Sequence, residues 1–508
     1  MLKKFAFIAF LIAVASGCAV NPVTGERELT LVSDQQAINI GTQQYGPAQQ
    51  MQGGAMAADT ALQGYVDAVG QRVAAASGVD LPYEFVVLNN STPNAWALPG
   101  GKIAINRGLL ALLQNEAELA AVLGHEVAHA AARHGAKRME RGIFTQGALV
   151  VAGIGLSNTQ YGNQVVGLAA QGAQLLNLRY SRNAEREADF YGMDFMIAAG
   201  YDPYASVTLQ EKFLRLAGDQ PAGPSLFASH PPSAERVQNN RQKVEQLRAA
   251  GQRGGEFKQA AYAQATRSIR QHAEAYEAYD EANALLANDA FDAAAAAAGR
   301  AISAYSAEPL FHGLRGGIRL QQGRAADAVT NLDRAIAADP NYFLHLLYRG
   351  SAHAKLGKVD AAEQDLKRSV ALLPTTAGYM GLGQIAEGRG DEAAAKGYYE
   401  AAGKSSGAAG EAARARYVAL DIDDQPARYV GTQVRLNDAG RPVLRVANLT
   451  SLALKNIQVQ VQVRTAAGVV SDSVRVASLE ASEQVGIRLQ AQGDLIDAQA
   501  RAVTAELQ

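Results

Sequence analysis

Two histidines four residues apart, His125 and His129, are well placed to bind one metal ion. At 3.6 residues per turn, positions i and i+4 of a helix lie on one face, so both imidazoles can reach a Zn²⁺ ion at about 2.0 Å. Glu126 lies one residue round that helix, where it can reach a water molecule rather than the metal. Zinc lowers the pKa of water to about 7, and a neighbouring carboxylate can take the proton. The pattern predicts a zinc hydrolase with one Zn²⁺ per chain and Glu126 as general base.

The third ligand has to come from elsewhere in the chain. Sites with a third histidine six residues after the second would need histidine at position 135, where this chain has Gly135. Glu185 and Asp189 are again four residues apart, on a second predicted helix that ends near Gly200. Glu185 can bind the metal while Asp189 hydrogen-bonds a ligand histidine. The first motif alone can arise by chance on an amphipathic helix, so the second motif is what favours a metal site.

The motif His-Glu-x-x-His at 125–129, followed by Glu-x-Glu-Ala-Asp-x-x-Gly at 185–192, resembles the zinc metallopeptidase family M48. This family includes the CAAX prenyl endopeptidases, HtpX and BepA. The resemblance implies a gluzincin-type domain, helical with a small β-sheet. It also implies that Asp189 is a proton donor or an orienting acid, that Glu126 is the base, and that zinc is bound by His125, His129 and Glu185.

A later segment, Ser229-His230-Pro231, resembles the part of the same family in which a histidine comes near the metal. His230 could stabilise the oxyanion of the tetrahedral intermediate, or bind zinc as a fourth ligand and displace the catalytic water. A structural histidine in a proline-rich turn is the alternative. Arg236 could orient nearby carboxylates or be a solvated helix residue. We expect the first helix to stop at Gly135. We do not expect His134 to be a ligand, because five positions along a helix turn its side chain away from His125 and His129.

Residues 94–105, with a turn at Gly100-Gly101, resemble the strand that runs beside the zinc site in this family. An exposed strand edge can bind an extended peptide through main-chain hydrogen bonds. An ordinary hairpin in a mixed sheet with residues 85–88 is compatible with that role. The apolar stretch Gly142 to Leu178 is expected between the two zinc helices, packed in the interior or touching membrane or substrate.

The first 18 residues have the pattern of a bacterial lipoprotein signal peptide. Two lysines precede the apolar run Phe5 to Val14, and Ala15-Ser16-Gly17-Cys18 resembles a lipobox. Cys18 is the only cysteine, which excludes an internal disulfide and suits lipid attachment. Ala19 in place of Asp favours the periplasmic face of the outer membrane. The alternative is a plain cleaved signal peptide with a chance cysteine.

The sequence predicts a peptidase domain at 19–252 and two further domains after it. A helical domain at 256–420 has a 34-residue period that is typical of tetratricopeptide repeats. Five positions recur at that period, namely Gly316, Gly323, Ala328, Leu332 and Pro340, followed by Gly350, Gly357, Ala362, Leu366 and Pro374. A third unit at Gly383, Gly390, Ala395 and Tyr399 is one residue short, and a degenerate first unit is expected from Tyr276 to Pro309. An unrelated helical bundle is the alternative.

The last segment, 425–508, alternates apolar and polar residues, as from Ile457 to Val463, and predicts a small β-sandwich. The fold class is therefore mainly α, with a peptidase domain, an α-solenoid and this β-sandwich. The chain has 508 residues, 48% of them apolar. Its net charge of −2 gives no indication of nucleic-acid binding.

These observations together predict a membrane-anchored periplasmic zinc endopeptidase. The resemblance to BepA implies unfolded or misassembled envelope proteins as substrates, and the repeats could contact the outer-membrane assembly machinery through a concave surface. The alternative is a chaperone-like repeat adaptor with a latent or vestigial zinc site.

Overall fold

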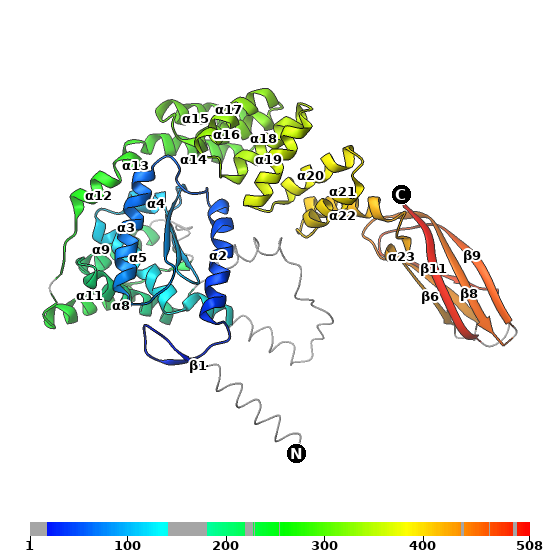
Figure 1. Cartoon of the computed structure of the whole chain (residues 1–508), viewed down its shortest axis with the longest axis horizontal. Helices are drawn as coiled ribbons and strands as arrows, with labels where there is room; N and C mark the ends of the chain where they lie inside the picture. Colours follow the sequence, from blue (N-terminus) through cyan, green and yellow to red (C-terminus); the bar gives the residue numbers. More distant parts are fainter. Residues whose placement is uncertain are drawn as a thin grey trace, which may run out of the picture. The chain divides into compact units, whose positions relative to one another are not determined.

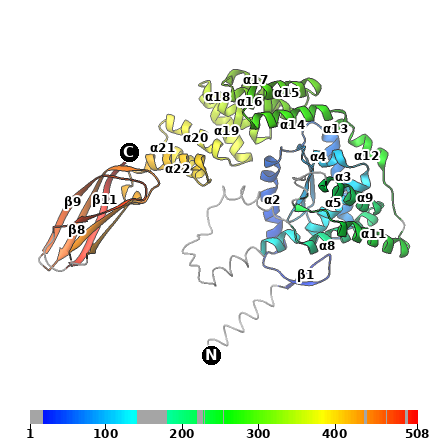
Figure 2. The same ribbon diagram turned by 180° about the vertical axis from the view of Figure 1, so that it is seen from behind.

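The computed structural model describes residues 18–140, 180–218, 227, 229–252, 254–437, 441–466, 468–490 and 495–508. The expected signal peptide before Cys18 and the apolar stretch Gly142 to Leu178 lie outside these residues. Most described elements are helices, so the predicted mainly α class is confirmed. No helix within the described ranges is both long and apolar enough to cross a bilayer. The chain divides into two compact units, Met1–Pro374 and Thr375–Gln508 (Figures 1 and 2).

The first unit contains a three-stranded mixed sheet with the order β3-β5-β4. Strand β5 (Lys102–Asn106) pairs in parallel with β3 (Glu84–Leu88) and antiparallel with β4 (Ala95–Leu98). The turn between β4 and β5 has Gly100 at φ +78° and Gly101 at φ +84°, a conformation that glycine adopts without steric cost. The predicted hairpin in a mixed sheet is confirmed, and β4 lies at its edge.

Helices cover both faces of this sheet, because alternate residues of each strand point to opposite sides. Helix α2 (Asp34–Met51) lies on one side, and α3 (Thr60–Ala76) and α5 (Glu116–Ala131) on the other (Figure 1). The α2 face buries Val86, Leu88, Trp96, Leu98 and Ala104 against Tyr45 and Ala48. The opposite face buries Phe85, Val87, Ile103 and Ile105 in the main core. Short helix α4 (Arg107–Leu112) connects the sheet to α5.

Helix α5 begins after its N-cap Asn115, whose side chain accepts a hydrogen bond from the Glu118 amide at 2.9 Å. It packs against α8 (Arg182–Ala198) at a very close approach. A Cβ atom on Gly124 would lie 3.0 Å from the carbonyl oxygen of Gly192, and one on Gly192 would lie 3.0 Å from the Gly124 carbonyl carbon. The two glycines therefore let the backbones of the two motif-bearing helices meet. Helices α9 (Tyr204–Gly218) and α11 (Ala234–Ala249) complete this side.

Paired helices follow, linked by α12 (Gln259–Ala265) and α13 (Arg267–Gln271). The pairs are α14 (Ala273–Ala287) with α15 (Phe291–Ala304), α16 (Pro309–Gln321) with α17 (Ala325–Ala338), and α18 (Phe343–Lys355) with α19 (Val359–Leu372). The repeat positions make equivalent contacts. A Cβ atom added to Gly316 would lie 2.6 Å from Leu332 Cγ, and one added to Gly350 would lie 2.9 Å from Leu366 Cγ. The predicted tetratricopeptide pattern is confirmed by this repeated packing.

The first repeats share a core with the helices around the sheet, through Tyr276, Phe311 and Tyr342. A fully buried carboxylate, Glu308, lies at this junction. It accepts hydrogen bonds from Asn89 Nδ2 at 2.9 Å and from the Tyr276 hydroxyl at 2.8 Å. The Arg107 guanidinium lies 3.4 Å above the Tyr276 ring. Polar as well as apolar contacts therefore join the repeats to the sheet-bearing region.

The second unit begins with α20 (Thr376–Gly388), α21 (Glu392–Gly403), α22 (Ala408–Asp421) and α23 (Pro426–Tyr429). The third repeat lies here, with a Cβ atom on Gly383 placed 2.5 Å from the Tyr399 ring. Two three-stranded sheets then share one core. One contains β6 (Val430–Leu436), β7 (Pro442–Asn448) and β10 (Gln484–Arg488), and the other β8 (Leu454–Thr465), β9 (Gly468–Leu479) and β11 (Leu495–Leu507). The predicted small β-sandwich is confirmed.

Candidate metal centre

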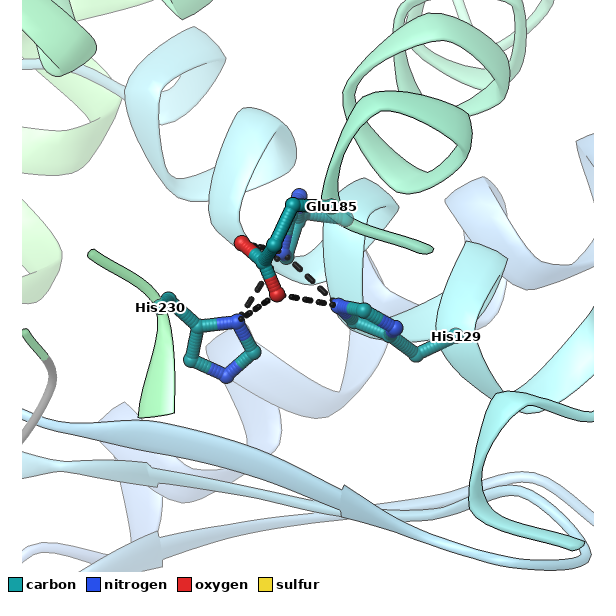
Figure 3. Close-up of side chains that lie close together, drawn as sticks. His129, Glu185 and His230 are labelled. Atoms are coloured by element: carbon teal, nitrogen blue, oxygen red, sulfur yellow. Dashed lines mark hydrogen bonds and ion pairs between the residues drawn. The ribbon is translucent and has the colours of Figure 1, made fainter. Parts of the chain in front are cut away.

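Four side chains from three segments converge in the first unit: His125 and His129 of α5, Glu185 of α8, and His230, which precedes α11. One ligand atom from each residue lies within 4.8 Å of every other. Figure 3 shows the imidazoles of His129 and His230 directed at the Glu185 carboxylate. The structure thus brings together the two sequence motifs and the later His-Pro segment.

The spacing of these atoms suits a cation with tetrahedral coordination. Four ligands at about 2.0–2.1 Å from a zinc ion lie about 3.3 Å from one another. Here the Nε2 atoms of His125 and His129 are 3.0 Å apart, and His125 Nε2 is 3.2 Å from His230 Nδ1. Glu185 Oε1 lies 3.4 Å from His129 Nε2 and 2.9 Å from His230 Nδ1. The donor set, three imidazoles and one carboxylate, also matches the ligand preference of zinc.

A hydrogen bond between the two Nε2 atoms requires a proton on one of them, whereas a shared cation requires a lone pair on each. His125 Nδ1 lies 3.0 Å from an Asp189 carboxylate oxygen, so in the neutral imidazole this nitrogen carries the proton and Nε2 carries a lone pair. His129 is fully buried, and burial lowers its pKa well below the usual value, which favours the neutral ligand form. A cation between the rings would satisfy the lone pairs.

Glu126 lies beside this group without belonging to it. Its carboxylate is 1% exposed, and Oε1 is 3.6 Å from His230 Nε2. Burial raises the pKa of Glu126, an effect that His230 and His125 partly oppose. Its Oε2 atom has no hydrogen-bond partner among the described residues. A small cavity of about 40 Å³ touches Glu126 and His125. The carboxylate is therefore available to a water or a substrate beside the metal ligands.

Arg236 is buried in the site rather than solvated, so of its two expected roles the structure supports the orienting one. Its Nε and Nη2 atoms donate to the two Asp189 oxygens, each at 2.7 Å, and its Nη1 lies 2.9 Å from Glu185 Oε2. Burial by itself would raise the pKa of Asp189, but the Arg236 guanidinium and His125 together outweigh burial and hold that pKa below its usual value. Asp189 is thus an ionised acceptor for His125.

His134 lies outside the group of four candidate ligands, as the sequence predicts, but its ring does not turn away from His129. Helix α5 ends at Ala131 rather than at Gly135, and Arg133 adopts φ +60°. The chain therefore leaves the helix three residues before His134, whose Nδ1 comes 2.8 Å from His129 Nδ1. Gly135 correctly indicated that the helix ends in this region. The prediction placed the end too late, because it assumed that the helix continues as far as this glycine.

Tyr180 was missed at the sequence level. Its ring stacks on His129 with centroids 3.9 Å apart, and its hydroxyl lies 3.4 Å from the carbonyl oxygen of Ala97 on edge strand β4. Its position directly before Ser181, the N-cap of α8, was the only available indication. Tyr180 therefore connects the edge strand with the metal ligands.

The part of the chain that carries this site matches a known protein family. The model of peptidase family M48 matches residues 60–244, which include the sheet and all four candidate ligands. Residues 60–244 form a peptidase family M48 domain. A tetratricopeptide repeat model matches residues 279–343 and 318–377. The M48 domain is thus followed by repeats, as the sequence predicts.

Three relatives of the M48 domain are informative. The mitochondrial metalloendopeptidase OMA1 of Schizosaccharomyces pombe is 35% identical over 34% of this chain and 50% of its own length. The β-barrel assembly-enhancing protease of Escherichia coli is 30% identical over 37% of this chain and 40% of its own. The metalloprotease YcaL of Escherichia coli is 33% identical over 32% and 63%. The chain therefore spans less than two thirds of each of these relatives.

Proposed function

We propose that this protein is a zinc endopeptidase that hydrolyses peptide bonds of unfolded or misassembled proteins of the bacterial envelope. The observation that carries the proposal is the convergence of His125, His129 and Glu185 beside Glu126, whose Oε2 atom has no hydrogen-bond partner among the described residues. Zinc held by these ligands would supply a Lewis acid that activates water and polarises a carbonyl. The relatives named as metalloproteases support this chemistry.

The protein's own residues divide the remaining work. Glu126 takes the proton of the attacking water and can pass it to the leaving amine. Asp189 holds the His125 ring by its Nδ1 atom, and Arg236 holds Asp189 in turn. In this role Asp189 orients the ligand and is not a proton donor, because both of its oxygens accept hydrogen bonds from Arg236.

Edge strand β4 is the proposed binding surface for an extended substrate. The Asn106 amide donates to the Asn94 carbonyl across the sheet, and the direction of the backbone groups alternates along a strand. Ala97, three residues after Asn94, therefore directs its backbone groups away from β5, and its carbonyl oxygen meets the Tyr180 hydroxyl. A cavity of about 200 Å³ lies between Ala97, Leu98 and the ligand His129. A peptide paired with β4 would therefore lie beside the metal ligands, with room for a side chain in this cavity.

Metal removal tests the proposed chemistry. We expect the purified full chain to contain about one zinc ion by elemental analysis, since the ligand set forms one site. Dialysis against a chelator should abolish cleavage of an unfolded protein such as casein, and added Zn²⁺ should restore it. Cleavage that persists in fully metal-free protein would exclude this mechanism.

His230 is proposed to be a latch that occupies the fourth ligand position. Its Nδ1 atom lies within the tetrahedral group, at 3.2 Å from His125 Nε2, which a histidine reserved for the oxyanion would not require. A closed four-ligand site is typical of structural zinc, whereas catalytic sites keep one position open. The site described here is accordingly in a resting state.

The variant His230→Ala is expected to raise kcat/KM on casein. A latch that favours the closed site by about 1.4 kcal/mol would give about a tenfold rise when it is removed. Steady-state kinetics of the two proteins at equal zinc content measure the change. A large loss of turnover would instead assign His230 to transition-state stabilisation, and an unchanged rate would remove both roles.

The proposed location is the periplasmic face of the outer membrane, with lipid attached to Cys18. The E. coli relative is named for β-barrel assembly, which supports envelope proteins as substrates and the assembly machinery as a partner of the repeats. In a bacterial host, Cys18→Ser should move the protein from the membrane to the soluble periplasmic fraction, because stable anchoring depends on the attached acyl chains. Unchanged membrane fractionation would contradict the lipid anchor.

A repeat adaptor with a latent zinc site is the second candidate. The fourth ligand at the site is the specific observation in its favour, since a permanently closed site would leave only binding. Casein cleavage by His230→Ala would decide against it.

A further inference from the structure

We infer that His134 and Glu187 form a hydrogen-bonded chain that fixes the tautomer and the orientation of the proposed metal ligand His129. The chain starts at His129 Nδ1, which lies 2.8 Å from His134 Nδ1. It continues from His134 Nε2 to Glu187 Oε2, at 3.1 Å. This inference rests on the proposed metal site, and it assigns a positioning role to two residues outside the ligand group.

The carboxylate at the end of the chain determines where each proton lies. Glu187 Oε2 is a carboxylate oxygen, so in its contact with His134 Nε2 it accepts the hydrogen bond. His134 therefore carries its proton on Nε2 and presents a lone pair at Nδ1. His129 must then donate from Nδ1, and its Nε2 lone pair faces the metal position.

The backbone is built to bring His134 to this place. Arg133 has φ +60°, a left-handed conformation that is uncommon for a residue with a side chain. Its guanidinium is held by the segment before α2, with Nη1 donating to Thr30 Oγ1 at 3.1 Å and Nη2 to the Val32 carbonyl at 2.5 Å. These contacts stabilise the turn that folds His134 back onto α5.

The two helical histidines are therefore supported in parallel ways. Asp189 accepts directly from His125, while Glu187 acts on His129 through an intervening imidazole. Both carboxylates come from α8, where they are two residues apart. His134 is 2% exposed, whereas the Glu187 side chain is 37% exposed. The series of hydrogen bonds therefore runs from the buried ligand His129 to the surface.

The test measures how fast the full-length protein loses Zn²⁺ to a chromogenic chelator. Outer partners of ligand histidines typically contribute 10- to 100-fold to metal affinity, so His134→Phe should speed the loss by about that factor. His134→Gln should recover much of it, because the amide offers an acceptor to His129 and a donor to Glu187. Equal rates for the Phe and Gln variants would overturn the inference.

Glu187 provides the second arm, at a partly exposed position where substitution is compatible with folding. Glu187→Ala should speed zinc loss, and Glu187→Gln, whose carbonyl can still accept, should do so less. Glu235→Ala, which removes an exposed carboxylate of α11, is the control and should leave the rate unchanged. In the double variant the effects of His134→Phe and Glu187→Ala should not add, because both break one chain. Additive effects would overturn the inference.

The zinc measurement also separates this inference from the proposed function. If the wild-type protein retains Zn²⁺ and the variants lose it faster, but casein is not cleaved even with His230→Ala added, the peptidase proposal is overturned and the positioning role is kept. If casein is cleaved and zinc loss is the same in all variants, the positioning chain falls alone. A wild-type chain that binds no Zn²⁺ after supplementation would overturn both.

Discussion

Glu126→Gln is expected to lower the rate of casein cleavage by about 10²–10⁴-fold, the range that a positioned general base contributes. The amide keeps the shape of the side chain but cannot take a proton. Because Glu126 is not one of the four candidate ligands, the variant should keep its zinc. Cleavage kinetics and elemental analysis of the same preparation measure the two quantities.

The control for this variant is Glu235→Gln, which alters an exposed carboxylate paired with Arg186 and should leave turnover unchanged. Equal cleavage by the wild type and Glu126→Gln would exclude Glu126 as the base. If neither protein cleaves casein, even with His230→Ala added, the adaptor function is favoured instead.

Arg236→Met is expected to destabilise the metal-free protein by about 3–5 kcal/mol, the usual result of removing one partner of a buried ion pair. The guanidinium is buried and contacts Asp189 and Glu185, both of which are also buried. Methionine fills much of the same volume but leaves these carboxylates without a compensating charge. Urea unfolding in the presence of a chelator measures the difference in the free energy of unfolding.

The same variant should lose less stability when zinc is bound, since a cation beside Glu185 and His125 offsets part of the missing charge. Arg241→Met, one turn further along α11 and more than half exposed, is the matched control and should unfold like the wild type. Equal losses with and without zinc would show that Arg236 acts through packing alone.

Arg236 also donates to the Pro231 carbonyl at 3.2 Å, in the residue after His230. One guanidinium therefore holds the orienting acid, a ligand carboxylate and the segment of the proposed latch. This shared role explains why Arg236, although distant from the metal motifs in sequence, is expected to have one of the largest effects.

Local periodicity was enough to predict much of this protein. The four-residue spacing of His125 and His129, and of Glu185 and Asp189, places each pair on one helical face whatever surrounds it. The 34-residue period predicted the repeated helix pairs, in which Gly316 packs on Leu332, and the alternation from Ile457 to Val463 predicted a strand, one face of which is buried. These features depend on the geometry of single elements, which short stretches of sequence specify.

Tertiary contacts decided the rest of the site. His134 meets His129 only because Arg133 is held in a left-handed conformation by Thr30 and Val32, about a hundred residues earlier in the chain. Likewise, Tyr180 and the buried Arg236 lie beside the ligands because α8 packs on α5, and α11 packs on α8 and α9. A sequence read residue by residue specifies helical faces and repeat periods. The side chains that surround a ligand depend on long-range packing, and only the folded structure determines that packing.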